Sequence, residues 1–350
     1  MEKSRKPKIR FKGFTDDWEQ REFSEMFDCT ISNNTLSRSE LSYEEGSILN
    51  IHYGDILIKY GSILDIHKYK IPRIPNEKKE DFRGSLLQPG DIVIADTAED
   101  ETTGKACEIG SLFGNSIVAG LHTMVARPNI EMASGYLGYY LNSNAYHCQL
   151  LPMMQGIKVL SLSRANVKKT ALKFPESTKE QQLIANYFIQ LDDLITLHQR
   201  KLEKLMNVKK SMLEKMFPKQ GSTVPEIRFN GFTQAWEQRK LGDFGKATGG
   251  ISIESEFSED GIYKVISIGS YSENSVYNDQ GIRAVKSDKT SNRVLNKNDL
   301  TMILNDKTTS GNIIGRVLLI EKSGISYYRT RSYSSNNSSF LFYLEVISYH

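Results

Sequence analysis

The chain has 350 residues, of which 39% are hydrophobic and 25% are charged, with a net charge of +3. This composition is typical of a soluble globular protein of about two domains, and the mild basic balance permits nucleic-acid binding without requiring it. The three cysteines form no C-x-x-C pair, no run approaches the roughly 20 apolar residues of a membrane span, and the start lacks the apolar core of a signal peptide. We therefore expect reduced thiols and a cytoplasmic location.

The opening motif of the chain occurs twice. Residues 7–21, PKIRFKGFTDDWEQR, return at 225–239 as PEIRFNGFTQAWEQR, with eleven of fifteen positions identical. The offset of 218 residues is far longer than the roughly 20–50 residues of a solenoid or propeller repeat. The chain therefore consists of two tandem copies of one unit, and a duplicated unit suggests recognition of two similar objects.

Short apolar runs separated by turn residues follow the first motif. Such runs predict strands at 47–51, 55–58, 91–95 and 116–119. Helical spacing of Tyr136, Leu137, Tyr140 and Leu141 predicts a helix over 134–151. In the second copy, 295–304 matches 87–95, and we expect 338–344 to correspond to the helix that starts at 134.

The longest predicted helix begins at Ser177. Ser177 and Glu180 form a capping-box pattern, and no Gly or Pro interrupts the sequence before Pro218. Steps of four and three residues then continue without error through ten positions, of which eight are apolar, and this period predicts a coiled-coil seam. The alternative is one amphipathic helix lying on a globular domain. The seam positions are Ile184, Phe188, Leu191, Ile195, His198, Leu202, Leu205, Lys209, Met212 and Met216.

Motifs of catalysis are missing from the sequence. It contains no G-x-x-x-x-G-K-[ST] loop, no G-x-G-x-x-G and no adjacent prolines, which the Asn/Asp-Pro-Pro-aromatic motif of amino-methyltransferases requires. Its six histidines show no metal-ligand spacing, so we expect no metal and no catalytic residues. The chain is predicted to recognise or to scaffold, and to rely on other proteins for chemistry.

The order of these motifs resembles a known family. A strand-rich domain opens with P-x-I-R-F-x-G-F-T-x-x-W-E-x-R and closes at 174–188 with F-P-x-S-x-x-E-Q-Q-L-I-A-x-Y-F; a long helix and the opening motif again follow. This closely resembles the specificity subunit of type I restriction–modification enzymes, over essentially the whole chain. The resemblance implies an α+β chain with two tandem mixed α/β, strand-rich target-recognition domains joined by a long coiled-coil helix.

The resemblance also implies a division of the chain and a set of partners. It gives a first recognition domain at 1–176, a spacer helix at 177–217, a linker at 218–224, and a second recognition domain at 225–350 that lacks its closing helix. The partners would be double-stranded DNA, modification subunits and restriction subunits. S-adenosylmethionine, ATP and Mg would bind to those subunits, and no cofactor would bind to this chain.

Candidate DNA-binding residues are basic, polar and aromatic side chains in predicted loops, since Arg and Lys contact guanine or phosphate and Asn or Gln contact adenine. For each of them, a solvated loop is the alternative. They are Lys59, Tyr60, Lys68, Lys70, Arg73, Thr102, Thr103, Lys105, Gln155, Lys158 and Ser161 in the first copy, and Arg283, Lys286, Thr308, Thr309 and Arg316 in the second.

Two other interpretations differ from the leading one in class. The chain could be a non-catalytic oligomerisation scaffold that acts through its coiled coil, or an inactive truncated specificity subunit. A single-chain nuclease or methyltransferase is disfavoured by the missing motifs. If the helix at 177–216 has no second helix of its own chain, we expect it to pair antiparallel with another copy and to form a homodimer that reads a symmetric target.

Overall fold

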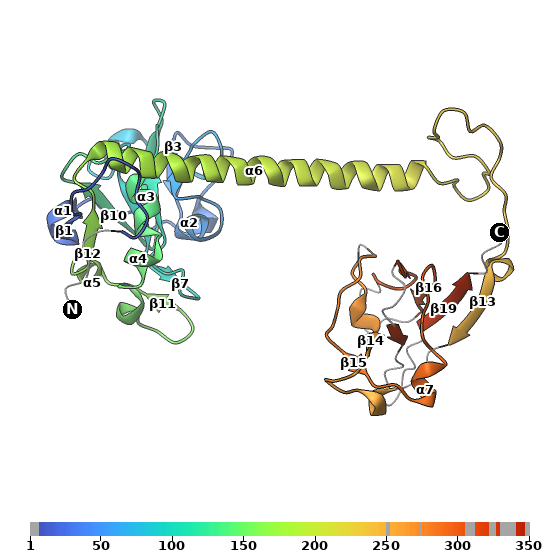
Figure 1. Cartoon of the computed structure of the whole chain (residues 1–350). Coiled ribbons are helices and arrows are strands. Elements are labelled where there is room, and N and C mark those ends of the chain that lie inside the picture. Colours follow the sequence, from blue (N-terminus) through green and yellow to red (C-terminus); the bar gives the residue numbers. More distant parts are fainter. Residues whose placement is uncertain are drawn as a thin grey trace. The chain divides into compact units, whose positions relative to one another are not determined.

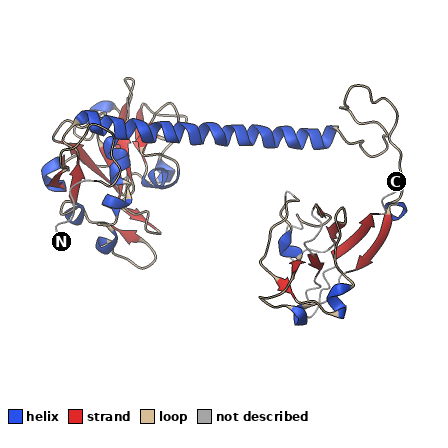
Figure 2. Cartoon of the chain, in the orientation of Figure 1, coloured by secondary structure: helices blue, strands red, loops and turns tan. Residues whose placement is uncertain are grey.

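A computed structural model describes residues 7–249, 253–273, 275–304, 312–321, 327–329 and 341–346. Contacts divide the chain into two compact units, Met1–Val208 and Lys209–His350. Both units combine strands with short helices, which confirms the predicted mixed, strand-rich class (Figures 1 and 2). A single long helix, α6 (Thr178–Lys215), begins in the first unit and ends in the second.

The centre of the first unit is a five-stranded sheet in the order β2-β10-β6-β8-β4. A three-stranded sheet, β5-β3-β9, and the pairs β1-β12 and β11-β7 surround it. Predicted strands at 47–51, 91–95 and 116–119 are confirmed as β3, β6 and β9. The strands are β1 (Glu19–Glu22), β2 (Phe27–Asp28), β3 (Ile48–Ile51), β4 (Ile63–Leu64), β5 (Arg73–Ile74), β6 (Ile92–Ala95), β7 (Thr97–Ala98), β8 (Ala106–Ile109), β9 (Ser116–Ala119), β10 (Thr123–Pro128), β11 (Leu160–Ser161) and β12 (Ala171–Phe174).

Two sequence predictions in the first unit are wrong in detail. The run at 55–58 is not a strand but part of helix α2, because Asp55 is held inside the fold and the His52 ring accepts the Gly54 amide at the start of the helix. The expected helix over 134–151 is two short helices, interrupted near Asn142. The helices before α6 are α1 (Phe23–Met26), α2 (Tyr53–Ile58), α3 (Tyr136–Leu141), α4 (Asn144–His147) and α5 (Arg164–Val167).

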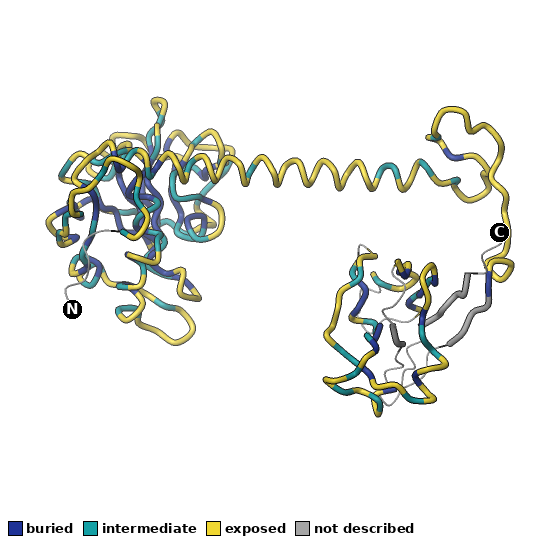
Figure 3. The backbone as a smooth tube through the Cα atoms, viewed as in Figure 1, coloured by how far each residue is buried: buried dark blue, intermediate teal, exposed yellow. Residues whose placement is uncertain are grey.

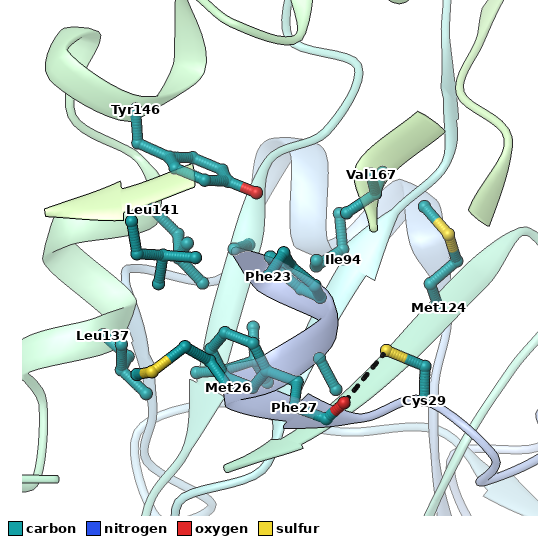
Figure 4. Close-up of a cluster of buried hydrophobic side chains, with 14 of the residues drawn as sticks. Phe23, Met26, Phe27, Cys29, Ile94, Met124, Leu137, Leu141, Tyr146 and Val167 are labelled. Atoms are coloured by element: carbon teal, nitrogen blue, oxygen red, sulfur yellow. Dashed lines mark hydrogen bonds between the residues drawn. The ribbon is translucent and has the colours of Figure 1, made fainter. Parts of the chain in front are cut away.

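Strand β6 contributes to two of the hydrophobic cores of the first unit. All four of its residues are buried, and alternate residues point to opposite faces of the sheet. Ile92 and Ile94 join the core that contains Phe23, whose neighbours appear in Figure 4. Val93 and Ala95 join the core beneath α2. A strand covered on both faces reads as a continuous apolar run, as this one does.

The second unit repeats the turn that precedes β6. The Asp91 carboxylate accepts the Gln88 amide at 2.9 Å, and the Asp299 carboxylate accepts the Asn296 amide at 2.5 Å. A strand pair follows in both units, β6 with β8 and β16 with β17. The elements of the second unit are β13 (Gly245–Gly249), β14 (Tyr263–Ile266), β15 (Arg283–Ala284), α7 (Asp288–Ser291), β16 (Leu300–Ile303), β17 (Val317–Leu319), β18 (Tyr327–Arg329) and β19 (Leu341–Val346).

The predicted match between 338–344 and the helix at 134 is wrong. Residues 341–346 form strand β19, which pairs with β13 and β16. In the first unit β10 holds the same place, between β2 and β6. The sequence LFYLEV suits a strand because aromatic and aliphatic side chains favour a pleated surface. The described part of the second unit therefore corresponds to the first unit as far as β10.

The first turns of α6 are built into the first unit. Ile184 and Ala185 join the core that contains Phe23, and the Gln181 side chain accepts the Ala133 amide at 2.9 Å. The buried Glu180 carboxylate receives two bonds from Arg10, at 2.6 and 2.7 Å, where the capping pattern predicted a bond to the Ser177 amide. Beyond these turns, most of α6 within the first unit is exposed (Figure 3).

The ion pair between Arg127 and Asp91 allows a test of what stabilises the central sheet. Its guanidinium binds Asp91 through two 2.7 Å bonds, and the Asp91 side chain is fully buried. We predict that Arg127→Ala lowers the free energy of unfolding by about 3–5 kcal/mol, because it leaves a buried carboxylate without its cation. Denaturant unfolding measures the change in the free energy of unfolding, and hydrogen exchange measures the protection of the β6 amides. Replacement of the exposed Arg83 by Ala is the control and should change stability by less than about 0.5 kcal/mol.

Candidate nucleic-acid interface

The site begins at the buried aspartate of α2. The Asp55 side chain has no exposed surface, and Arg38 binds both of its oxygens, at 2.6 and 2.7 Å. The Lys59 ammonium lies 2.9 Å from the same carboxylate. Burial raises the pKa of Asp55, but the two cations outweigh it and the net pKa is lowered. Asp55 therefore holds two cations at the surface in defined positions.

Tyr43 gathers three cations around one ring. Arg38, Lys59 and Lys70 lie 5.6, 5.4 and 5.5 Å from its centroid, and Lys59 also donates to its hydroxyl at 3.0 Å. Such contacts are favourable because the face of an aromatic ring is electronegative. We call Arg38, Tyr43, Lys59 and Lys70 the Tyr43 cluster. With Asp55 and Glu44 as its carboxylate partners, it carries more positive than negative groups.

An aromatic step continues from this cluster. Tyr53, on α2, lies 4.7 Å from His52 and 5.3 Å from His122, measured between ring centroids. His122 has a φ of 54°, a left-handed conformation that is uncommon for residues other than glycine. Its ring lies 3.5 Å from the Asp96 carboxylate. Burial lowers the pKa of His52, which favours the neutral ring. The step presents Tyr53 and His122 as flat groups beside the cations.

A hairpin forms the far end of the surface. The Thr97 hydroxyl lies 3.5 Å from the His122 ring, and β7 pairs with β11 through Thr97 and Ser161. Gln155 and Ser161 exchange two backbone bonds and close the loop between them, which Figure 1 shows before β11. Ile157, at the tip, is fully exposed. Tyr53 begins helix α2 and Lys59 caps its end, Tyr53 contacts His122, and His122 contacts Thr97 of the strand that pairs with the hairpin. We group the Tyr43 cluster, Tyr53, His122 and this hairpin as the α2–hairpin strip.

Two predicted DNA-binding residues, Tyr60 and Thr103, are buried, and a third, Lys105, is bound by backbone carbonyl groups. Tyr60 is 2% exposed and belongs to the core beneath α2, and burial raises its pKa. Thr103 is fully buried and donates to the Asp100 carbonyl. The Lys105 ammonium donates to the carbonyl groups of Leu57 and Tyr60, and burial lowers its pKa. These side chains stabilise the loops beneath the surface and are not free to contact DNA.

The other candidates of the first unit remain accessible. Lys59 and Lys70 belong to the Tyr43 cluster, while Gln155 and Ser161 close the hairpin that carries Lys158. Lys68 lies over the ring of Tyr69 at 5.7 Å. The remaining two are held by local bonds, from the Arg73 guanidinium to the Gly46 carbonyl and from the Thr102 hydroxyl to the Asp100 carboxylate.

Those candidates of the second unit that lie in the described residues do not form a comparable group. Arg283 pairs with Asp279, whose pKa is lowered mainly by Lys264. The Arg316 side chain donates to the Asn312 carbonyl at 3.2 Å, and Lys286 is exposed. Thr308 and Thr309 lie outside the described residues.

The predicted seam of α6 divides into three parts. Ile184 is packed against the first core, and Phe188 lies 5.3 Å from Tyr139. Met212 and Met216 line a groove in the second unit. The positions between these ends are exposed on α6: Leu191, Ile195, His198, Leu202, Leu205 and Lys209.

The sequence analysis missed several residues of the strip. Arg38, Tyr43, Tyr53, His122 and Ile157 carry no local motif, and they come together only through Asp55 and the turn before β10. In the described part of the chain, no three His, Cys, Asp or Glu side chains form a group that could hold a metal ion. None of its helices is both long and apolar enough to cross a membrane.

The comparisons with known proteins identify the family. The family model described as type I restriction modification DNA specificity domain matches residues 15–207 and 233–349. The chain therefore belongs to the family of type I restriction–modification specificity domains. The protein named type I restriction enzyme MjaX specificity subunit, from Methanocaldococcus jannaschii, is 24% identical over 238 residues, which are 65% of this chain and 52% of that protein. The chain thus spans about half the length of this curated relative.

Solved structures of similar proteins are distant in sequence. The specificity subunit of a type I system from M. genitalium is 15% identical, with a TM-score of 0.47 over 98% of this chain and 75% of that one. The HsdS subunit from Thermoanaerobacter tengcongensis is 13% identical, with a TM-score of 0.44 over 98% of this chain and 78% of that one.

The Asp55 pairs should make stability depend on pH. A carboxylate whose pKa is lowered on folding stabilises the fold above its unfolded pKa of about 3.9, and the benefit is lost as pH falls through the folded pKa. We predict that Asp55→Asn lowers the free energy of unfolding at pH 7 by about 2–4 kcal/mol. The gap to the wild type should narrow below about pH 4 and close as the pH falls through the lowered folded pKa, where the wild-type carboxyl becomes protonated.

Denaturant titrations at several pH values measure this gap. Replacement of the exposed Glu80 by Gln is the matched control and should show little difference at any pH. A gap for Asp55→Asn that persists unchanged at pH 2 would contradict the assignment of a charged Asp55.

Proposed function

We propose that this chain is the DNA-sequence-recognition subunit of a type I restriction–modification complex. The observation that carries the proposal is the α2–hairpin strip, where cations, aromatic rings and a polar hairpin form one surface of the first unit. Phosphate contacts position a protein on DNA, while side chains that reach base edges specify the sequence. The strip contains groups of both kinds.

The strip suggests a division of roles among its residues. Lys70 and Lys158 in the strip, and Lys68 two residues before Lys70, are exposed cations suited to phosphate oxygens. Gln155 can make two hydrogen bonds to an adenine edge, and Tyr53 with His122 offers flat surfaces beside it. Asp55 keeps Arg38 and Lys59 in place before DNA arrives, which lowers the entropy lost on binding.

The chemistry of the complex would belong to other subunits. We propose that modification subunits bind S-adenosylmethionine and methylate adenine, and that restriction subunits use ATP and Mg to translocate and cleave. The absence of nucleotide-binding and methyltransferase motifs from the sequence supports a non-catalytic role for this chain. The proposal places the complex in the cytoplasm, with the cell's DNA. A scaffold without DNA binding and an inactive specificity subunit are the alternatives.

DNA binding can be tested without knowledge of the target. We predict that Lys68→Ala, Lys70→Ala and Lys158→Ala together weaken binding to a random duplex pool. They should also reduce the slope of log K against log salt by about 0.9 for each phosphate that the variant no longer neutralises. Fluorescence anisotropy at several salt concentrations, with the modification subunit present, measures both quantities.

Replacement of Lys179, which is exposed at the start of α6, by Ala is the matched control. It removes one lysine charge outside the strip and should leave the slope unchanged. An unchanged slope for the triple variant would contradict the strip, and no binding by the wild type would favour the scaffold.

We further propose that α6 pairs with another long helix through its exposed seam. The spacing of the seam residues is the same in both directions from the midpoint between Ile195 and His198. Two copies of this chain can therefore pair antiparallel with their seams in contact. In this register Phe188 faces Leu205, Leu191 faces Leu202, and Ile195 faces His198 of the other copy. The contacts between Phe188 and Leu205 and between Leu191 and Leu202 are apolar on both helices. A two-fold homodimer of this kind would read a symmetric, interrupted target.

The seam predicts a specific loss of assembly. Leu202→Asp with Leu205→Asp should abolish self-association or binding of the partner helix, because the interface would bury unpaired charges. Sedimentation with and without the modification subunit measures the assembly state of each variant. Leu197→Asp is the control: it replaces an exposed leucine of α6 outside the seam and should leave assembly intact. Unchanged sedimentation of the double variant would count against the seam.

A crosslink tests the antiparallel register itself. Cysteines at Ile195 and His198, in a background where the exposed Cys148 is replaced by serine, should form intermolecular disulfides under mild oxidation. Monomeric protein throughout this experiment would exclude the homodimer and leave a helix from another protein as the partner.

A further inference from the structure

The hairpin of the α2–hairpin strip, residues 155–161, has an apolar tip. At the tip Ile157 is fully exposed and Val159 is 50% exposed, with the exposed Lys158 between them in the sequence. Turns are usually formed by glycine, proline and small polar residues, which water solvates well. Two branched apolar side chains at the tip of a turn therefore indicate contact with a ligand.

The base of the hairpin is fixed to the first unit. Gln155 and Ser161 exchange backbone bonds of 3.0 and 2.8 Å, and β11 pairs with β7, which follows β6 of the central sheet. The next residue, Leu162, donates its amide to the Asp96 carbonyl at 2.8 Å, and its side chain enters the core that contains Phe23. Figure 1 shows the loop beyond β11 extending from the body of this unit. A fixed base thus carries a protruding apolar tip.

Gly156 determines how the tip leaves the base. Its φ is 126°, which favours glycine, and a Cβ atom at this position would overlap the Val159 carbonyl oxygen. The backbone therefore passes closely over Val159 and then turns outward at Ile157. Any side chain at position 156 would open this turn and move Ile157.

The charges around the hairpin favour an approach by its tip alone. Glu99, Asp100 and Glu101 follow β7 directly and are exposed beside the base, where the Thr103 hydroxyl reaches the Leu160 carbonyl at 3.4 Å. These carboxylates would repel a DNA backbone that lay along the base. The tip carries Lys158 instead, so it is the part of the hairpin that a duplex can approach.

We propose that Ile157 inserts between neighbouring base pairs of bound DNA and unstacks one step. This inference rests on the DNA recognition proposed above and adds a mechanism to it. Apolar side chains that enter the base stack kink the duplex, and the contacts that the kink permits offset the cost of unstacking. Lys158, next to the inserted side chain, neutralises a phosphate beside the opened step.

An inserted isoleucine selects DNA without a hydrogen bond to any base. Pyrimidine–purine steps such as TA and CA are the most easily unstacked, so the inserted side chain favours them. A site where the stack is already broken, such as an abasic position, costs even less to open. The chain therefore discriminates between duplexes by how readily their bases separate at the position of Ile157.

The insertion can be tested with the full chain and the modification subunit. One probe is a labelled duplex with a single abasic site, compared by fluorescence anisotropy with its intact counterpart. We expect the wild type to bind the abasic duplex at least about fivefold more tightly. A second probe is an intact duplex with 2-aminopurine at a central TA step, whose fluorescence should rise on binding as the base unstacks.

Variants of the hairpin separate insertion from ordinary contact. Ile157→Ser should lose both the preference and the fluorescence change, while Ile157→Leu should retain both because its side chain is still apolar and of similar size. Gly156→Ala should lose them although Ile157 is present, since the turn would open. Ile262→Ser is the matched control: it makes the same change at a 67% exposed isoleucine of the second unit and should alter neither readout.

The outcomes distinguish this inference from the DNA recognition on which it rests. Equal binding of both duplexes by the wild type, with unchanged 2-aminopurine fluorescence, would overturn the insertion and leave DNA recognition standing. Binding of neither duplex would overturn both. Loss of modification-subunit binding by Ile157→Ser, with the DNA readouts unchanged, would overturn the insertion and identify a protein as the partner of the tip.

Discussion

The docking of the first turns of α6 is the interaction on which the rest of the structure depends. Glu180 is bound by Arg10 from the opening motif, and Ile184 and Ala185 enter the core of the first unit. One ion pair therefore connects two segments that are 170 residues apart. Because this end of the helix is buried, its direction relative to the first unit is determined. The seam residues from Leu191 to Lys209 then remain exposed on α6 and available to another helix.

A second buried carboxylate organises the surface that we propose binds DNA. Asp55 has no exposed side-chain surface, yet both of its partners, Arg38 and Lys59, reach the surface. Burial of a charge is costly unless it is paired, so the pairing holds the cations in position. Tyr43 then collects these two and Lys70 around its ring. A loop that carried the same residues without Asp55 would lose this order.

Internal repetition provides a comparison within one molecule. The turn before β6 and the turn before β16 use the same aspartate-to-amide bond, and the two opening motifs hold their arginines by the same carbonyl contact. Where the copies differ, the difference is informative. Arg10 has a carboxylate ligand and Arg228, among the described residues, has none. The two motifs are thus equivalent in sequence but differ in the contacts that their arginines make.

The sequence by itself determined the duplication, the strand-rich class and the long helix. These follow from local identity, from apolar runs at β3, β6 and β9, and from a periodic pattern that covers α6. Such signals are local, and neighbouring residues suffice to produce them.

Only the tertiary structure decided which side chains form a surface. The run at 55–58 has the apolar composition of a strand, yet Asp55 pairs with Arg38 and the segment becomes helix α2. Tyr60 and Lys105 belong to predicted loops, yet the fold buries the first and binds the second to carbonyl groups. Arg38 is 17 residues from Asp55 in the sequence, and Leu57 is 48 residues from Lys105. No local pattern specifies them, because burial and pairing depend on contacts that form only when distant segments meet.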